Sequence, residues 1–278
     1  MNIFKFIKKL YFKIKQKLFH NIYIKILKQK EKKFETLFNF YSIINESIKI
    51  KVKFLNSEYF IIDDKRKYKF FPLERIRFYE RGLDHRSQTL KEEYLLNNIE
   101  FKDDDIIIDI GANNGDFYFC FDKKIKYHGY EPSPIVFSNL QYNVKNQNLY
   151  NLGLSNSDSK IVEFYLKDES GDSSILPLND YTNKINIKTT TLDNEIDKIK
   201  KKIKLIKLEA EGFEPEILQG LKKYLNYVEY ITIDCGFERG IKQESTITEC
   251  TNYLIQNNFE MIDFGIPRIV TLFKNLKS

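Results

Sequence analysis

The chain has 278 residues, of which 42% are hydrophobic and 15% aromatic, so it can bury one substantial α/β core. Its three cysteines lack the paired spacing of zinc or redox motifs, and no apolar run approaches the roughly 20 residues that span a bilayer. The net charge of +6 is uneven, because residues 1–33 carry +10 and the remainder carries −4. A disulfide framework, a structural zinc site, a signal peptide and a membrane span are not expected, and the cytoplasm is the expected compartment.

Residues 1–45 are expected to form a basic amphipathic helical extension. Apolar residues recur at three- and four-residue steps from Ile3 to Leu18, as on one face of a helix, and lysines interrupt them throughout. Such a helix is typical of peripheral contact with anionic lipid, here at the inner face of the membrane through residues 1–33. Packing on the rest of the chain or on a second copy is the alternative. The mildly acidic remainder offers no extended basic platform, so no nucleic-acid partner is expected.

The segment 46–100 is expected to contain a small strand pair within 48–62, followed after Pro72 by lead-in helices up to Leu96. From 101 to 278, strand and helix patterns alternate, which predicts one doubly wound α/β domain. The expected strands are 105–110, 126–131, a short one near 149–154, 203–209 and 228–234, and the expected helices are 115–124, 134–146, 214–225 and 245–257. Segments 161–166 and 185–191 are expected to form an insert beyond the central sheet. Residues 259–265 and 268–274 predict a closing hairpin with Pro267 in its turn.

A glycine turn follows the first strand of this domain. The run from Asp105 to Gly115 is an apolar, β-branched strand that ends in Gly-Ala-Asn-Asn-Gly. Gly111 and Gly115 let the backbone lie close to a ligand, which a Cβ would obstruct. Glu131 closes the next apolar stretch, where an acid can accept hydrogen bonds from both hydroxyls of an adenosine ribose. Strand, turn, helix, strand and acid together predict a nucleoside-binding half-site.

The ligand type follows from the residues around that turn. A dinucleotide site requires Gly-x-Gly-x-x-Gly, so that a pyrophosphate can rest on bare backbone. Here the pattern is Asp-x-Gly-x-x-x-Gly, with Asp109 ahead of the turn. An acid at that position repels a pyrophosphate but can hold a cationic amino group, which favours S-adenosylmethionine over NAD. A nucleotide or nucleotide-sugar enzyme of another type, such as a dehydrogenase or epimerase, is the alternative, and a non-catalytic membrane-binding protein is a third hypothesis.

A second acidic turn follows the strand at 203–209. Glu209 and Glu211 lie at the carboxyl edge of the predicted sheet, and Asp234 follows the next strand. Residues two apart on a strand point to one face, so Glu209 and Glu211 are expected to converge on a substrate hydroxyl or on one divalent cation. The alternative is that one of them caps the helix that begins near Glu214 or pairs with a nearby Lys. A metal is not favoured, because this cluster alone argues for one. His85 and His128 are the other candidate bases, with His128 expected to be packed inside its strand.

Together, Asp109-Ile-Gly-Ala-Asn-Asn-Gly115, Tyr130-Glu-Pro132 and Glu209-Ala-Glu-Gly212 resemble the FkbM-type methyltransferase family over about 77–273. The resemblance implies a class I Rossmann-like fold: a mostly parallel seven-stranded sheet, helices on both faces and a C-terminal antiparallel hairpin. It implies an S-adenosylmethionine-dependent O-methyltransferase, with a sugar hydroxyl of a surface polysaccharide or lipid-linked glycan as the expected acceptor. The family usually has Asp-x-Glu-Gly where this chain has Glu209-Ala-Glu-Gly212, which puts the geometry of the first acid in doubt.

The expected site combines these motifs with the acids at the carboxyl edge of the sheet. The residues expected to bind the cofactor are Asp109, Gly111, Ala112, Asn113, Gly115, Glu131, Pro132 and Ser155, the last in a segment similar to the family's third strand near the adenine. The expected catalytic residues are Glu209, Glu211 and Asp234. The segments 156–190 and 236–244 and the N-terminal region are expected to contact a small-molecule or glycan acceptor.

Overall fold

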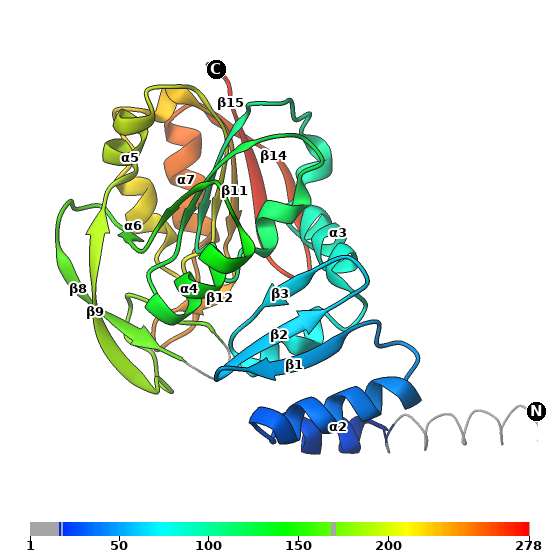
Figure 1. Cartoon of the computed structure of the whole chain (residues 1–278). Coiled ribbons are helices and arrows are strands. Elements are labelled where there is room, and N and C mark those ends of the chain that lie inside the picture. Colours follow the sequence, from blue (N-terminus) through cyan, green and yellow to red (C-terminus); the bar gives the residue numbers. More distant parts are fainter. Residues whose placement is uncertain (1–16, 18, 168–170, 278) are drawn as a thin grey trace, which may run out of the picture. The chain divides into compact units, whose positions relative to one another are not determined.

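The computed structural model describes residues 17, 19–167 and 171–277, and it divides the chain into two compact units, 1–83 and 84–278 (Figure 1). The boundary falls inside the segment expected at 46–100. The apolar positions expected on the N-terminal helix, from Ile3 to Leu18, all lie outside the described residues. No helix in the described part of the chain is both long and apolar enough to cross a bilayer.

The first unit is a small α/β layer. Helix α2 (Glu31–Ile44) buries Phe34, Phe38 and Tyr41, and its Asn39 side chain bonds both the N–H and the carbonyl of Val52 at 2.8 Å. The sheet contains β1 (Lys51–Leu55), β2 (Glu58–Ile62) and β3 (Lys67–Lys69), and the 3₁₀-helix η1 (Leu73–Phe78) follows. The expected strand pair is confirmed. The third strand, β3, was not predicted, because three residues of which two are lysines show no alternation of apolar and polar positions.

The second unit contains a seven-stranded sheet in the order β14-β15-β11-β10-β4-β5-β6. Strands β4, β5, β6, β10 and β11 are parallel, whereas β15 is antiparallel to both β11 and β14. This is the class I architecture expected from the resemblance, including its C-terminal antiparallel hairpin. The strands are β4 (Ile106–Ile110), β5 (Lys126–Tyr130), β6 (Asn148–Tyr150), β10 (Ile203–Leu208), β11 (Val228–Asp234), β14 (Phe259–Gly265) and β15 (Val270–Asn275).

Alternation along β4 separates two cores, one on each face of this sheet. Ile106, Ile108 and Ile110 face a core completed by α5 (Leu192–Ile199), α6 (Glu214–Gln219) and α7 (Ile247–Gln256). Ile107 faces the other core, to which α3 (Leu83–Glu93), η3 (Asp116–Cys120) and α4 (Pro134–Asn143) contribute. Figure 1 shows α5, α6 and α7 together on one side of the strands and α3 on the other. Asp109 belongs by the same alternation to the face of Ile107.

An insert leaves the central sheet after β6, as the sequence predicts for 161–166 and 185–191. It is a three-stranded sheet in the order β7-β9-β8, made of β7 (Gly153–Leu154), β8 (Ile161–Leu166) and β9 (Asn183–Thr190). The strand expected near 149–154 is therefore two strands in two different sheets. Helix α5, which the sequence pattern did not predict, follows β9 and is capped by Thr191, whose hydroxyl accepts a hydrogen bond from the Asn194 N–H.

Two expected helices are shorter than predicted. The helix expected at 115–124 is only the 3₁₀-helix η3, which begins after Gly115 in a left-handed conformation (φ 92°). The helix expected at 214–225 ends as α6 at Gln219. Its next residue, Gly220, packs so closely that a Cβ there would lie 2.3 Å from the Ser155 carbonyl oxygen. Close packing against neighbouring backbone, rather than helix propensity, decides where α6 stops.

Candidate active site

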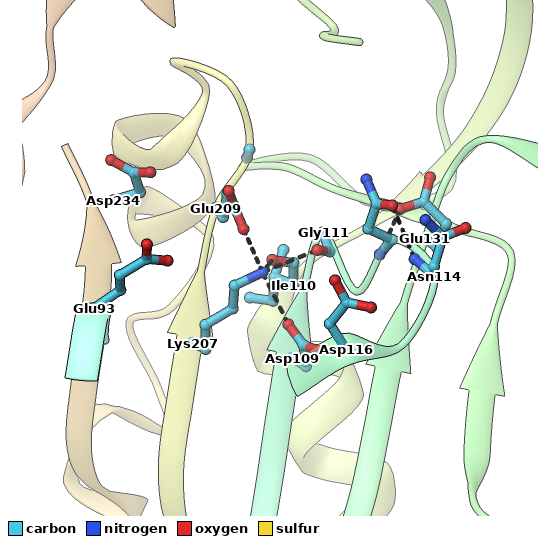
Figure 2. A network of polar contacts seen from close by, with 12 residues as sticks. Glu93, Asp109, Ile110, Gly111, Asn114, Asp116, Glu131, Lys207, Glu209 and Asp234 are labelled. Atoms are coloured by element: carbon cyan, nitrogen blue, oxygen red, sulfur yellow. Dashed lines mark hydrogen bonds and ion pairs between the residues drawn. The ribbon is translucent and has the colours of Figure 1, made fainter. Parts of the chain in front are cut away.

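A buried lysine connects the two motifs that the sequence analysis singled out. β4 and β10 are neighbours in the sheet, and their register places Lys207 directly beside Asp109. The Lys207 Nζ lies 3.1 Å from Asp109 Oδ1 and 2.8 Å from Glu209 Oε2, and it donates to the carbonyls of Gly111 (2.9 Å) and Ile110 (3.3 Å). Figure 2 shows this ammonium between the end of β10 and the start of the glycine turn. One charge thus fixes the cofactor-side turn against the acidic turn.

Asp109 is fully buried, and its carboxylate forms an ion pair with Lys207. The Tyr127 hydroxyl donates a hydrogen bond to the other carboxylate oxygen of Asp109. The Tyr127 ring packs over Gly129, where a Cβ would lie 2.8 Å from the ring. Burial raises the pKa of Asp109, and Lys207 and Tyr127 offset the increase only in part. The role expected for Asp109 toward a cationic cofactor group stays a prediction.

The glycine turn adopts the backbone conformations that its sequence requires. Gly111 has φ 73°, and a Cβ there would lie 2.0 Å from the Glu209 carbonyl oxygen. The N–H groups of Gly111 and Ala112 both donate to the Tyr130 carbonyl at 3.0 Å, which ties the turn to the end of β5. Gly115 also has a positive φ, and a Cβ there would meet Val144 at 2.6 Å. Any side chain at either glycine would push the turn away from its neighbours.

Glu131 lies at the end of β5, against the same turn. Its Oε2 accepts from the Asn113 N–H at 3.0 Å and its Oε1 accepts from the Ser133 N–H at 2.8 Å. Each carboxylate oxygen has a second lone pair, so two ribose hydroxyls can still donate to it. Burial raises the pKa of Glu131 to about 7, although both backbone hydrogen bonds and Lys207 lower it. The residues here fit the nucleoside half of S-adenosylmethionine.

Pro132 and Ser155 complete the expected cofactor set, and the structure ties each to other groups. The Asn151 side chain donates to the carbonyls of Glu131 (2.8 Å) and Pro132 (3.0 Å), so it fixes the segment after β5. Ser155 follows β7, where its N–H donates to Thr190 and its hydroxyl accepts from the Ser157 N–H. Its expected contact with the cofactor stays a prediction.

Two of the three expected catalytic acids are ion-paired with Arg268. This arginine comes from the turn between β14 and β15 and bonds both Glu209 and Asp234, and its Nη1 also lies 3.6 Å from Glu93 Oε2. Burial works to raise the pKa of Glu209, but Arg268 and Lys207 outweigh it and hold that pKa well below its usual range. Burial raises the pKa of Asp234 despite Arg268. Glu209 is consequently a poor proton acceptor, and its ion pairs with Lys207 and Arg268 hold those two side chains in place.

Glu211 has a different environment. The expectation that it shares a strand face with Glu209 is wrong, because β10 ends at Leu208 and Glu211 lies in the following turn with φ 51°. Burial, together with the charges of Glu238 and Glu209, raises the pKa of Glu211 well above its usual range. The alternative that Glu209 or Glu211 caps α6 is not confirmed, because no side chain accepts a cap hydrogen bond at the start of that helix. Glu214 instead fixes the preceding turn, accepting from the N–H groups of Ala210 (2.8 Å) and Gly212 (3.1 Å).

The other candidates from the sequence were a metal site and the two histidines His85 and His128. Within the described ranges, no group of three or more His, Cys, Asp and Glu side chains is placed to hold a metal ion. His128 is packed in β5, stacked on Tyr150, and burial lowers its pKa. His85 lies in α3, where Thr89 donates to its carbonyl at 2.9 Å.

Sequence reasoning missed three residues that shape the site. Lys207 carried a usable signal, because a lysine inside an apolar strand needs a buried counter-charge, and Asp109 stands in the other buried strand. Glu238, in β12 (Phe237–Arg239), follows the fifth strand of the sheet, where ligands bind in such folds. Burial and the charge of Asp234 raise the pKa of Glu238 to about 8. Arg268 gave no signal, since an arginine in a hairpin turn is ordinarily solvated.

Comparison with known families decides between the cofactors. The methyltransferase FkbM domain family matches residues 109–261, more than half of the chain, and the match includes both turns described above. The chain belongs to the FkbM methyltransferase family. It is therefore an S-adenosylmethionine-dependent methyltransferase, and the dehydrogenase and epimerase alternatives lose their basis. No match is found among curated proteins.

Solved structures resemble this FkbM methyltransferase only distantly. The ribosomal protein L11 methylase from Lactobacillus delbrueckii subsp. bulgaricus is 11% identical with a TM-score of 0.42, over 69% of this chain and 79% of that one. The magnesium protoporphyrin IX methyltransferase from Synechocystis PCC 6803, solved with bound SAM, is 9% identical with a TM-score of 0.40, over 73% and 83%. Similarity at this level carries no inference about the acceptor.

The charges at this sheet edge suit a cationic cofactor. Five acids and three bases are linked by ion pairs across β4, β10, β11 and α3, which gives a formal charge of −2: Glu93, Asp109, Asp116, Glu209 and Asp234 with Arg86, Lys207 and Arg268. S-adenosylmethionine has an ammonium, a sulfonium and one carboxylate, so its net charge is positive. The same acids would repel a negatively charged pyrophosphate.

Removing the Lys207 ammonium is expected to destabilise the second unit. Lys207→Met leaves the buried Asp109 carboxylate without its cation, a loss of about 3–5 kcal/mol in the free energy of unfolding. Lys204→Met is the matched control, because Lys204 lies on the same strand but pairs with the more exposed Glu229, a pair worth less than about 1 kcal/mol. Urea unfolding measures both. The double variant Asp109→Asn/Lys207→Met should recover part of the loss, and equal losses for the two lysines would contradict the assignment.

Binding of S-adenosylhomocysteine is expected to weaken below neutral pH. The ionised form of Glu131 accepts hydroxyl donors best, and with its pKa at about 7 only about one-tenth of it is ionised at pH 6. The dissociation constant at pH 6 should therefore exceed that at pH 8 by up to about tenfold. Isothermal titration at both pH values tests this, with Glu131→Gln as the variant that should lose the dependence. A dependence that persists in Glu131→Gln would assign the titration to another group.

Proposed function

We propose that this methyltransferase transfers the methyl group to a hydroxyl oxygen of a sugar, in a surface polysaccharide or a lipid-linked glycan. The observation that carries the proposal is the environment of Glu211. A neutral hydroxyl is a weak nucleophile and needs a positioned base, whereas an amine that is already unprotonated does not. A carboxylate whose pKa is raised above its usual range is a stronger base, and burial with the charges of neighbouring acids raises the pKa of Glu211 in that direction.

The three expected catalytic acids take different roles in this proposal. Glu211 accepts the hydroxyl proton, and Glu238, whose pKa is raised to about 8 by burial and neighbouring acids, shares that negative environment. Glu209 and Asp234 instead hold Arg268, which fixes the hairpin turn beside the end of β10. They act as positioning residues. The bound cofactor supplies the activated methyl group, and the protein aligns acceptor and base, an effect that is worth several kcal/mol in such displacements.

A glycan acceptor and a place at the inner face of the membrane are further parts of the proposal. The FkbM resemblance supports the glycan. The concentration of positive charge in residues 1–33, eleven Lys against one Glu, supports proximity to anionic lipid, where a lipid-linked acceptor is presented. The acidic remainder of the chain does not favour a nucleic-acid acceptor.

Methyl-labelled S-adenosylmethionine identifies the acceptor class. Purified enzyme is incubated with lipid-linked glycan, cell-surface polysaccharide, RNA and protein fractions of its own host cells. We expect label in a glycan fraction, in a form that survives mild alkali and is recovered as an O-methyl sugar after acid hydrolysis, because an ether resists alkali. Label that mild alkali releases as methanol would indicate a methyl ester, and label in RNA or protein alone would contradict the proposal.

Glu211→Gln is expected to lower kcat on the labelled fraction by about a hundredfold or more while leaving the affinity for S-adenosylhomocysteine within about twofold. The matched control is Glu229→Gln, which makes the same change at the amino end of β11, away from the site edge. For the wild type, the rate should rise with pH through the raised pKa of Glu211. A Glu211→Gln variant with wild-type kcat would remove Glu211 as the base.

A further inference from the structure

The two units have opposite charge. Residues 1–83 contain 21 Lys and Arg against eight Asp and Glu, a net charge of +13, whereas residues 84–278 carry −7. The expected cofactor-binding residues and the three expected catalytic acids all lie in the acidic unit. None of these residues lies in the basic unit, so the charge of that unit calls for a separate explanation.

Helix α2 presents an apolar stripe to solvent within that basic unit. Its buried face is formed by Phe34, Phe38 and Tyr41. Outside that buried face, four large apolar side chains are exposed at helical spacing: Leu37 (37%), Phe40 (62%), Ile43 (74%) and Ile44 (53%). An ordinary surface helix places polar residues at such positions, so this stripe indicates an interaction surface.

Exposed lysines precede the stripe in the chain. Lys33 lies four residues before Leu37, on the same face of α2, and Lys32 of the same helix is also exposed. The segment that leads into the helix exposes three more lysines: Lys25, Lys28 and Lys30. Acids are few here, and Glu35 is held by Lys32 and by the N–H of Phe54. An apolar helix face with adjacent lysines matches an anionic bilayer surface, in which apolar side chains enter the acyl boundary and ammonium groups meet the phosphates.

We propose that the exposed face of α2, made by Leu37, Phe40, Ile43 and Ile44 with the lysines of residues 25–33, binds the surface of an anionic lipid bilayer. Two copies that met through this face would bring together two units of +13 each, which disfavours a self-association surface. The proposal extends the membrane contact expected for residues 1–33 to a defined helix face. It deepens the proposed function by supplying a route to a lipid-linked acceptor, but lipid binding itself requires no methyl transfer.

Vesicle co-sedimentation of the full chain tests the proposal. The probes are phosphatidylcholine vesicles and phosphatidylcholine vesicles that contain one-quarter phosphatidylglycerol, each at low and at high salt. We expect binding to the anionic vesicles, weakened at high salt, and little binding to the neutral ones. The variant Phe40→Ser/Ile43→Ser should lower the partition coefficient on anionic vesicles at least about tenfold, because it removes the two most exposed side chains of the stripe.

The matched control is Ile135→Ser/Ile161→Ser, which removes two comparably exposed apolar side chains (55% and 68%) from the acidic unit and should leave partition unchanged. Circular dichroism and S-adenosylhomocysteine titration confirm that all variants are folded and retain their cofactor site, so a failure of the lipid proposal stays distinct from a failure of the methyltransferase site. Three results would overturn the proposal: wild-type partition of the α2 variant, binding that deletion of residues 1–16 alone abolishes, or a dimer in ultracentrifugation that only the α2 variant disrupts.

Discussion

The ion pair between Lys207 and Asp109 is the constraint on which the rest of the site depends. Both side chains lie on one face of adjacent parallel strands, in a core where an isolated charge of either sign would be costly. Their pairing satisfies both, and the same ammonium reaches the Gly111 carbonyl and Glu209. The glycine turn and the acidic turn are consequently fixed to each other. Methyl transfer requires that kind of alignment, because the methyl group passes between two bound molecules.

The charges around this pair shift the pKa values of two neighbouring carboxylates, Glu209 and Glu211, in opposite directions. Glu209 is held ionised by two cations and anchors structure, whereas Glu211, only two residues further, is surrounded mainly by other acids and keeps its proton to higher pH. The change of direction at the end of β10 produces this difference, since Glu211 leaves the strand in a left-handed conformation. Opposite shifts in neighbouring acids are a common way for one site to contain both an anchor and a base.

The sequence predicted most of the second unit because its strands are short apolar runs and its turns contain glycines that only a few conformations accommodate. The turn from Gly111 to Gly115 and the position of Glu131 follow from those local rules. Lys207, Glu238 and Arg268 do not, because their partners lie on strands or turns distant in sequence and are known only once the strand order is known. The short helices η3 and α6 were predicted too long for a related reason: packing against backbone stops them, and local propensity contains no information about that contact.

The two turns and Glu131 are expected to form a site that binds a nucleoside carrying a cationic amino group and excludes a pyrophosphate. Isothermal titration of the wild type and of Glu131→Ala with S-adenosylhomocysteine and with NAD tests this expectation most directly. We expect the wild type to bind S-adenosylhomocysteine at least about a hundredfold more tightly than NAD, and Glu131→Ala to lose most of this affinity while remaining folded. Equal or tighter binding of NAD, or full affinity in Glu131→Ala, would contradict it.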